Sequence, residues 1–429
     1  MLIDFTIKNY LSFKDEKTFS FLCNSKNVKE EVKLLSVDEG KYQLYTASVI
    51  LGPNASGKTN FMKAFVDFRS FVTHSSNYEI NQIIPCYKPF KLNTKSLESP
   101  TIFDIEFVND NQHYSYKVEF NGTKVISETL SIFTKKINLS KSILLERKEQ
   151  EVIYGAKFKG NKAVFSTLML PNKLLLSLIG NSNNEMLKPA YDFFSKGLNT
   201  DFSDQKNNVR SSKYTTTSLI TGNMDLKELT IKMLKAADIQ VTDIEFGKDK
   251  NSEFEKETSE LSKDIPFFKH DVFDENHSLK NETLFDLYGE ESAGTNKLFE
   301  MASFILITLI EGKVLIIDEL SSSLHPKIEL FIIKLFLDNE INVKGAQLLI
   351  NTHNINIIDN NLFTREQVWF TDRNKYGESN LFCLDEFDKN LIRDYANYGK
   401  SYCDNRLGAL PNPCLKSFKD DLIAYYAQE

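Results

Sequence analysis

Residues 46–59 read Thr-Ala-Ser-Val-Ile-Leu-Gly-Pro-Asn-Ala-Ser-Gly-Lys-Thr, an apolar run that breaks at a Gly-Pro pair and ends in Gly-Lys-Thr. The first six residues predict a buried strand, and apolar residues at helical spacing from Lys58 to about His74 predict a helix. The loop between them, Gly52–Thr59, matches GxxxxGK[ST] in the strand–loop–helix context that the pattern requires. This context favours a phosphate-binding loop over a chance glycine-rich turn.

Such a loop points successive backbone N–H groups at phosphate oxygens, and the following helix adds its positive end. Lys58 would reach the β- and γ-phosphates, and the Thr59 hydroxyl would bind Mg²⁺. No Asn-Lys-x-Asp follows the loop at a strand end, so we expect ATP with Mg²⁺ rather than a guanine nucleotide. The residues expected to bind the nucleotide are Gly52, Pro53, Asn54, Ala55, Ser56, Gly57, Lys58, Thr59 and Asn60.

A second motif is the run Lys-Val-Leu-Ile-Ile-Asp-Glu at 313–319, an apolar strand that ends in two acids. At the end of a strand, Asp318 can hold Mg²⁺ through water, and Glu319 can act as the general base for the attacking water. The alternative is a strand followed by solvated carboxylates. Downstream of a phosphate-binding loop, the catalytic interpretation is favoured.

Two further motifs are less specific by themselves. His353 ends the apolar run Gln-Leu-Leu-Ile-Asn-Thr-His, one helix after the acid pair. It is a candidate γ-phosphate sensor, and the alternative is a hydrogen-bonded core histidine. Ser292, Ala293, Gly294 and Thr295 precede an apolar helix, where they form either an anion site or a plain N-cap.

Strands that alternate with helices predict an α/β fold with a mostly parallel sheet. We expect strands at 2–7, 46–51, 313–317, 346–351 and 367–371, helices at 295–311 (with Gly312 as its C-cap) and 326–337, and antiparallel strands from 100 to 135 that continue weakly through 142–166. Residues 168–245 look helical, and charged residues 246–282 look like a surface insertion or linker. The expected domains are an N-terminal ATPase lobe (1–167), a helical region with this insertion (168–282) and a C-terminal ATPase lobe (283–429).

Composition excludes several classes of protein. The chain has 52 Lys and Arg against 59 Asp and Glu, so contact with nucleic acid would need a local basic patch. Five scattered Cys favour a reducing compartment over a disulfide framework. Without a signal-peptide core or an apolar run long enough to span a bilayer, we expect a cytoplasmic protein with no membrane partner.

The order of phosphate-binding loop, ESAGT, LIIDEL, SSSLHP and INTH resembles the ATPase heads of ABC and SMC-like proteins. Within these it is similar to the short bacterial AAA-type ATPases, a group that includes RloA/AbiL-like and OLD-like proteins linked to phage defence. The family's opening phrase matches Lys8–Phe13, and its late phrases match Gln367–Phe370 and Arg406–Pro411. The resemblance implies a P-loop NTPase of ABC-ATPase type, with a mixed sheet, an antiparallel β segment and a helical signature lobe.

The resemblance also implies roles for particular residues. Ser292–Thr295 would be the signature motif that completes the site of a second protomer. Ser321, Ser322 and Ser323 would form the D-loop at the dimer interface, His353 would be the switch histidine, and Asn9 of the opening phrase would bind nucleotide. The Q-loop glutamine is not placed, with Gln82 and Gln112 as candidates. OLD-like proteins carry a Toprim nuclease, but the residues after His353 lack a clear Glu…Asp-x-Asp set.

These observations lead to the hypothesis of an ATP-hydrolysing switch in abortive infection. It would be a homodimer or higher oligomer that controls a separate effector, for which a nuclease is the candidate. A second hypothesis is a DNA-repair ATPase of the RecF or SMC kind, because basic residues cluster at Lys135–Lys136, Lys141, Arg147–Lys148, Lys157, Lys159 and Lys162. A third is a scaffold that binds ATP without appreciable hydrolysis, and a transporter ATPase is weaker still. The tail 391–413 is either a partner surface or a packed cap.

Overall fold

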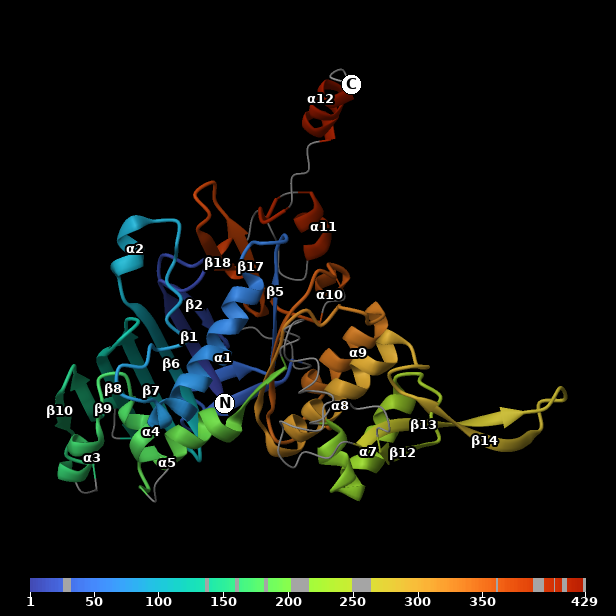
Figure 1. Cartoon of the computed structure of the whole chain (residues 1–429), viewed down its shortest axis with the longest axis horizontal. Coiled ribbons are helices and arrows are strands. Elements are labelled where there is room, and N and C mark those ends of the chain that lie inside the picture. The colour runs from blue at the N-terminus through green and yellow to red at the C-terminus, as the bar shows by residue number, and fades with distance from the viewer. Residues whose placement is uncertain are drawn as a thin grey trace.

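Two large sheets organise the molecule (Figure 1). The computed structural model describes residues 1–25, 32–135, 139–158, 162–180, 184–201, 216–248, 264–359, 362–388, 397–404, 406–410 and 415–426. One sheet is mostly parallel and carries the predicted motifs at its strand ends, whereas the other is antiparallel. Two smaller antiparallel sheets complete the β structure.

The mostly parallel sheet has the strand order β11-β15-β16-β5-β17-β18. Its strands are β5 (Ala47–Leu51), β11 (Leu198–Asp201), β15 (Val314–Ile317), β16 (Gln347–Asn351), β17 (Val368–Arg373) and β18 (Ser379–Cys383). All neighbours are parallel except β17 and β18. Strand β5 lies between β16 and β17, so residues near both ends of the sequence share one sheet. The domain boundaries at 167/168 and 282/283 stay a prediction.

The antiparallel sheet has the order β10-β9-β8-β7-β6-β1-β2. Its strands are β1 (Leu2–Lys8), β2 (Lys17–Ser20), β6 (Thr101–Asn109), β7 (Gln112–Phe120), β8 (Val125–Lys135), β9 (Leu139–Lys148) and β10 (Glu151–Tyr154). A hairpin turn at Asn121-Gly122 joins β7 to β8. The β segment is thus where the sequence predicts it, but residues Lys162–Leu168 form helix α3 instead of its continuation.

Helices fill the space between and beside the sheets. They are α1 (Lys58–His74), α2 (Thr94–Glu98), α4 (Leu175–Gly180), α5 (Lys188–Asp192), α7 (Met224–Ala236), α8 (Ala293–Glu311), α9 (Pro326–Leu337), α10 (Asn356–Asp359), α11 (Tyr398–Cys403) and α12 (Leu415–Tyr426). Short turns of other helix types are η1 (Ser75–Asn77), η2 (Phe193–Gly197), η3 (Arg365–Gln367) and η4 (Leu384–Glu386). Gly312 ends α8 in a left-handed conformation, as predicted for its C-cap.

Each face of the parallel sheet packs into its own core. On β15, Val314 and Ile316 join the core that α1 shares with the antiparallel sheet, whereas Leu315 and Ile317 join the core with α8 and α9. This alternation follows from the period of two in a strand. Because helices cover both faces, the strand ends are the exposed places on this sheet where polar groups can gather.

Of the two alternatives for residues 246–282, the described part agrees with a surface insertion and not with a linker, because it forms paired strands that are largely exposed. Strands β12 (Asp243–Lys248), β13 (Asp264–Phe273) and β14 (Leu279–Asp286) form an antiparallel sheet, of which β13 and β14 extend away from the body (Figure 1). Residues 249–263 lie outside the described ones. A further small sheet pairs β3 (Leu34–Val37) with β4 (Tyr42–Tyr45).

Within the described ranges, one helix is long and apolar enough to cross a membrane, although the sequence analysis expects no such segment. It is α8, and 44% of its most apolar window is buried inside the molecule. Its buried face, with Leu298, Phe299 and Ile305, belongs to the core beside the parallel sheet. Length and apolar composition here are those of a core helix.

Candidate nucleotide-binding site

The loop Gly52–Thr59 connects the end of β5 to the start of α1, as the sequence predicts. It depends on glycine at Gly57, whose φ of 120° is rarely adopted by other residues. A Cβ there would also lie 2.5 Å from Ser379 Oγ. The loop therefore runs so close to β18 that a side chain at position 57 would not fit.

Lys58 is the buried cation of this loop, with 5% of its surface exposed. Its Nζ donates to the carbonyl oxygens of Gly52 at 2.7 Å and Pro53 at 2.9 Å, so the ammonium lies within the loop's own curve. Burial lowers the pKa of Lys58 to about 8, while the carboxylates of Glu319 and Asp318 act in the opposite direction. An arriving phosphate would favour the charged form of this amine.

The phosphate-binding loop and the acid pair meet, although some 260 positions separate them. The Thr59 hydroxyl donates to Asp318 Oδ1 at 3.0 Å, and Asp318 also accepts from the Asn351 amide. Burial raises the pKa of Asp318, and the hydrogen bonds from Asn351 and Thr59 oppose that rise. A hydroxyl beside a carboxylate is the hard oxygen pair that Mg²⁺ prefers, so these two residues fit a magnesium ion.

Glu319 and His353 lie together at the end of the parallel sheet. Glu319 has a left-handed φ of 54°, and its backbone N–H donates to Asn351 Oδ1 at 2.6 Å. The Asn351 side chain thus orients both members of the acid pair. Burial, and then the charge of Lys58, lower the pKa of the His353 imidazole. A neutral imidazole can donate one hydrogen bond to a phosphate oxygen.

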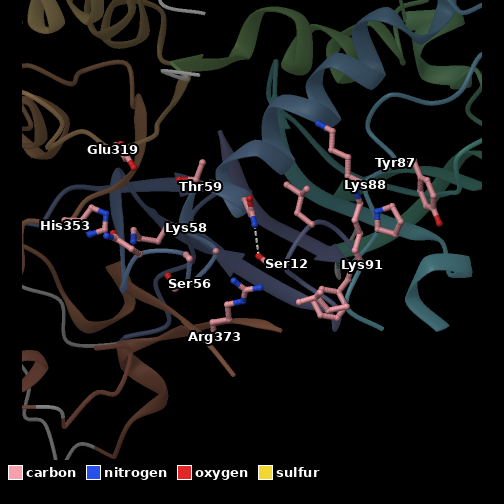
Figure 2. Close-up of a pocket in the computed structure, with 18 residues that line it drawn as sticks. Ser12, Ser56, Lys58, Thr59, Tyr87, Lys88, Lys91, Glu319, His353 and Arg373 are labelled. Carbon is pink, nitrogen blue, oxygen red and sulfur yellow. Dashed lines mark hydrogen bonds between the residues drawn. The ribbon is translucent and has the colours of Figure 1, made fainter. Parts of the chain in front are cut away.

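A cavity of about 670 Å³ opens over the loop, which is large enough for a ligand of nucleotide size. Figure 2 shows Glu319 and His353 at one end, beside Lys58, and Tyr87 and Lys91 at the other. Its lining comprises Leu11, Ser12, Asn54–Asn60, Tyr87–Leu92, Glu319, His353 and Arg373. The cavity therefore contains the predicted loop residues Asn54–Asn60, the predicted base and the predicted switch histidine.

Gly52 and Pro53 line a second cavity, of about 400 Å³, which shares Asn54 and His353 with the first. Tyr402 and Leu410 of the C-terminal tail form part of its wall. Tyr402 belongs to the core, and its hydroxyl donates to Ala409 O at 2.6 Å. The described part of the tail, 397–404 and 406–410, is thus a packed cap, whereas 391–396, 405 and 411–413 lie outside the described residues.

Asn9 does not line the cavity, contrary to the role that the resemblance implies. It is buried, and its amide donates to the carbonyl oxygens of Ser96 and Ser99 while its Oδ1 accepts from Phe90 N. Asn9 instead holds residues 90–99, the segment that begins in the cavity wall and includes α2. Its neighbours Leu11 and Ser12 line the cavity, and Ser12 Oγ accepts from the Asn60 amide at 2.8 Å.

The signature and D-loop residues lie outside the cavity of their own chain. Ser292 is the N-cap of α8, where its hydroxyl accepts from Thr295 N at 3.1 Å. A Cβ on Gly294 would lie 2.9 Å from Ser323 O, so the two motifs pack against each other. None of the residues Ser292–Thr295 or Ser321–Ser323 is among the cavity-lining ones. Gln82 and Gln112 do not line the cavity either.

The structure also places residues that the sequence analysis missed. Arg373 and Lys91 add cations to the cavity lining, which also includes Lys88, whose ammonium is paired with Asp67, and Asn351 connects the acid pair. Arg373 ends β17, the strand beside β5, so an analysis of strand order could have found it. Lys88 and Lys91 lie in an irregular loop, for which the sequence shows no signal.

A phosphate-binding loop, a joined acid pair and a cavity at the ends of parallel strands define a P-loop ATPase. A family model described as "AAA domain, putative AbiEii toxin, Type IV TA system" matches residues 47–359, and the chain belongs to that family. The expected fold class, an α/β P-loop ATPase with a mixed sheet and an antiparallel β segment, is confirmed.

Two solved structures are similar over most of the chain. The SMC head domain from Thermotoga maritima has 12% identity and a TM-score of 0.39, covering 89% of this chain and 98% of that one. An SmcHead bound to the C-winged helix domain of ScpA has 10% identity and a TM-score of 0.38, covering 89% and 97%. The search of curated proteins returned no match.

Proposed function

We propose that this protein hydrolyses MgATP at a site that a second copy completes, and that it acts as the switch of an anti-phage system whose effector is a separate protein. The observation that carries the proposal is the 3.0 Å contact between Thr59 and Asp318 beside a cavity that also contains Lys58 and Glu319. A loop for phosphate, oxygens for magnesium and a carboxylate for water are the parts that phosphoryl transfer requires.

The cavity supports a division of roles among its residues. The loop amides and Lys58 would bind the β- and γ-phosphates, and Thr59 and Asp318 would hold Mg²⁺, which neutralises charge on the phosphate oxygens when bound. Glu319 would accept a proton from the attacking water, and His353 would donate to the γ-phosphate. The Asn351 side chain supports this division of roles. Its NH₂ group donates to the Asp318 carboxylate, whereas its Oδ1 accepts from the Glu319 backbone N–H and leaves the Glu319 carboxylate free of Asn351.

The position of the signature supports completion in trans. Ser292 and Gly294 lie outside the cavity of their own chain, yet they form the N-terminal end of the 19-residue helix α8. Such a helix end attracts anions. In a two-fold dimer, this end of one copy would face the γ-phosphate in the other, and a lone protomer would hydrolyse ATP slowly.

The family description supports a role in defence, because it mentions a toxin–antitoxin system. The resemblance to RloA/AbiL-like and OLD-like ATPases points the same way. The proposed chemistry of this chain is ATP hydrolysis alone, so damage to the host or the phage would come from a separate effector, with a nuclease as our candidate. A cytoplasmic location follows from this role.

The DNA-repair hypothesis receives less support from the basic cluster. Arg147 is fully buried and donates to backbone carbonyls, and Lys141 donates to Ser115 Oγ. Lys148 pairs with Glu146 at 3.3 Å. Residues 136 and 159 lie outside the described ones. Arg147, at the centre of the cluster in sequence, is therefore not available to contact DNA.

Mixing two inactive variants tests the proposal. Lys58→Ala removes the phosphate contact and Ser292→Arg blocks the signature, so each protein alone should lose hydrolysis. A mixed dimer holds one site with both parts intact, and activity should return on mixing, with a rate per protomer that rises with concentration. Glu319→Gln should bind ATP and not turn it over.

A matched control separates the signature from its N-cap role. Asn223 caps α7 by accepting from Leu226 N, just as Ser292 caps α8, but it does not belong to the signature motif. Asn223→Arg should therefore retain ATPase activity. Full activity of Ser292→Arg alone, or no recovery on mixing, would count against completion in trans.

A further inference from the structure

A buried carboxylate on helix α9 bonds both residues that flank His353. Glu329 Oε1 accepts from the Thr352 hydroxyl at 3.0 Å, and Glu329 Oε2 accepts from the Asn354 amide at 2.5 Å. Asn354 N in turn donates to Thr352 Oγ1 at 3.0 Å. The carboxylate therefore closes a ring of hydrogen bonds around the segment that presents His353.

This carboxylate is costly to keep in place. Glu329 has no exposed surface, and burial raises its pKa, while the hydrogen bonds from Asn354 and Thr352 oppose that rise. Glu329 lies in the first turn of α9, where the helix end favours negative charge. An apolar residue would fill the same space without the desolvation cost, so packing alone does not account for a glutamate here.

The same segment is tied to the D-loop. His353 N donates to Ser321 Oγ at 3.4 Å, and Leu320 N donates to Asn351 O at 3.2 Å. Helix α9 begins at Pro326, three positions after the end of the D-loop Ser321–Ser323. Residues 320–329 thus hold the His353 segment at three points, namely Leu320, the D-loop residue Ser321 and Glu329.

We propose that Glu329 is a positioning residue, which fixes the Thr352–Asn354 segment so that His353 faces the nucleotide cavity. The inference rests on the proposed function for the role of His353, but the contacts that carry it do not depend on that role. Residues 320–329 connect the D-loop to the His353 segment. A partner copy that contacts the D-loop would therefore affect the position of His353 through Glu329.

Glu329→Gln is the first test, because it keeps the shape and removes the charge. Its amide oxygen can still accept from Thr352, but its NH₂ group faces the Asn354 NH₂ group. Turning Asn354 over would sacrifice the bond in which its Oδ1 accepts from Asn356 N at 3.2 Å. We expect kcat to fall by about tenfold, the size expected for one charged hydrogen bond, with KM for ATP little changed.

A swapped pair provides the rescue. In Glu329→Gln/Asn354→Asp, the new carboxylate accepts from the new amide and still accepts from Asn356 N, so kcat should return toward the wild-type value. Asn354→Asp alone places two carboxylates in contact and should be worse than Glu329→Gln. A double variant no better than Glu329→Gln would overturn the proposal.

Removal of the histidine separates positioning from general stability. If Glu329 acts through His353, then Glu329→Gln should have no further effect on kcat in a His353→Ala background. Independent, multiplicative losses would overturn the proposal. Glu366→Gln is the matched control, because Glu366 is buried, accepts from Tyr45 OH at 2.7 Å and lies outside the cavity. It should leave kcat and KM unchanged.

A readout without ATP keeps the proposal testable even if the proposed function fails. Amide hydrogen exchange of a peptide covering 350–358 should rise at least about tenfold in Glu329→Gln and not in Glu366→Gln. Absent ATPase activity in the wild type, together with this exchange result, would refute the proposed function and leave the positioning role. Unchanged exchange would refute the positioning role itself.

Discussion

Raising the pH above about 8 should weaken ATP binding, because Lys58 must gain a proton when the phosphates arrive. Burial lowers the pKa of Lys58 to about 8 in the free protein. Phosphate oxygens favour the ammonium form, so the pKa of Lys58 in the complex is higher than in the free protein. Below pH 8 the amine is charged in both states, and affinity does not depend on its titration. Above pH 8, binding takes up one proton.

The size of the change in Kd follows from the fraction of the free protein in which Lys58 is protonated. With a pKa of about 8, that fraction falls from roughly three quarters at pH 7.5 to roughly one eleventh at pH 9, so Kd should rise about eightfold. The terminal phosphate of ATP, with a pKa of about 6, is ionised throughout this range and adds no comparable slope.

Calorimetric titration with Mg²⁺ and a non-hydrolysable ATP analogue measures both the Kd and the number of protons taken up on binding. Titrations at pH 9 in two buffers of different ionisation enthalpy give the number of protons taken up, which should approach one. Lys58→Arg is the control, because a guanidinium stays charged at this pH and should give weaker binding with no slope. A flat Kd for the wild type, or an equal slope in Lys58→Arg, would refute the assignment of Lys58.

Three further substitutions test particular contacts. Gly57→Ala should abolish nucleotide binding, since the new methyl would lie 2.5 Å from a neighbouring hydroxyl oxygen, whereas Gly40→Ala, with nothing within 4 Å, should bind normally in the same titration. Asn351→Ala removes two hydrogen bonds from the acid pair, and steady-state assays should show kcat reduced by about 10- to 100-fold; a normal kcat would contradict its orienting role. Arg147→Met leaves the buried Glu128 carboxylate without its cation and should lower the free energy of unfolding in urea by about 3–5 kcal/mol, with much of the loss recovered by adding Glu128→Gln.

The centre of the site could be predicted because its signals are local. A strand, a glycine loop and a helix follow one another at 47–74, and the strand at 314–317 leads directly into its two acids. The convergence of Thr59 and Asp318 then follows from a parallel sheet, whose strand ends meet at one edge. No such local signal marks Arg373 or Lys91, which reach the cavity through the path of the chain.

The missed strands have a common physical reason. Strand β11, with the sequence Leu-Asn-Thr-Asp, has one apolar residue and is held as an edge strand by backbone pairing to β15. Strand β14 is exposed along most of its length and shows no alternation. Its sheet is connected by ion pairs such as Lys269 with Glu245 at 2.8 Å. An alternating hydrophobic pattern predicts strands that bury one face. Neither β11 nor β14 buries an apolar face, so the pattern could not reveal them.

The central place of β5 has a consequence during synthesis. Its sheet neighbours are β16, at 347–351, and β17, at 368–373. At about 5–20 residues per second, a ribosome needs roughly 15–60 s to progress from one to the other. For that time Ala47–Leu51, fully buried in the finished protein, has no sheet partner. A nascent chain must keep this apolar segment from aggregating, and chaperones could protect it until β16 and β17 have been synthesised.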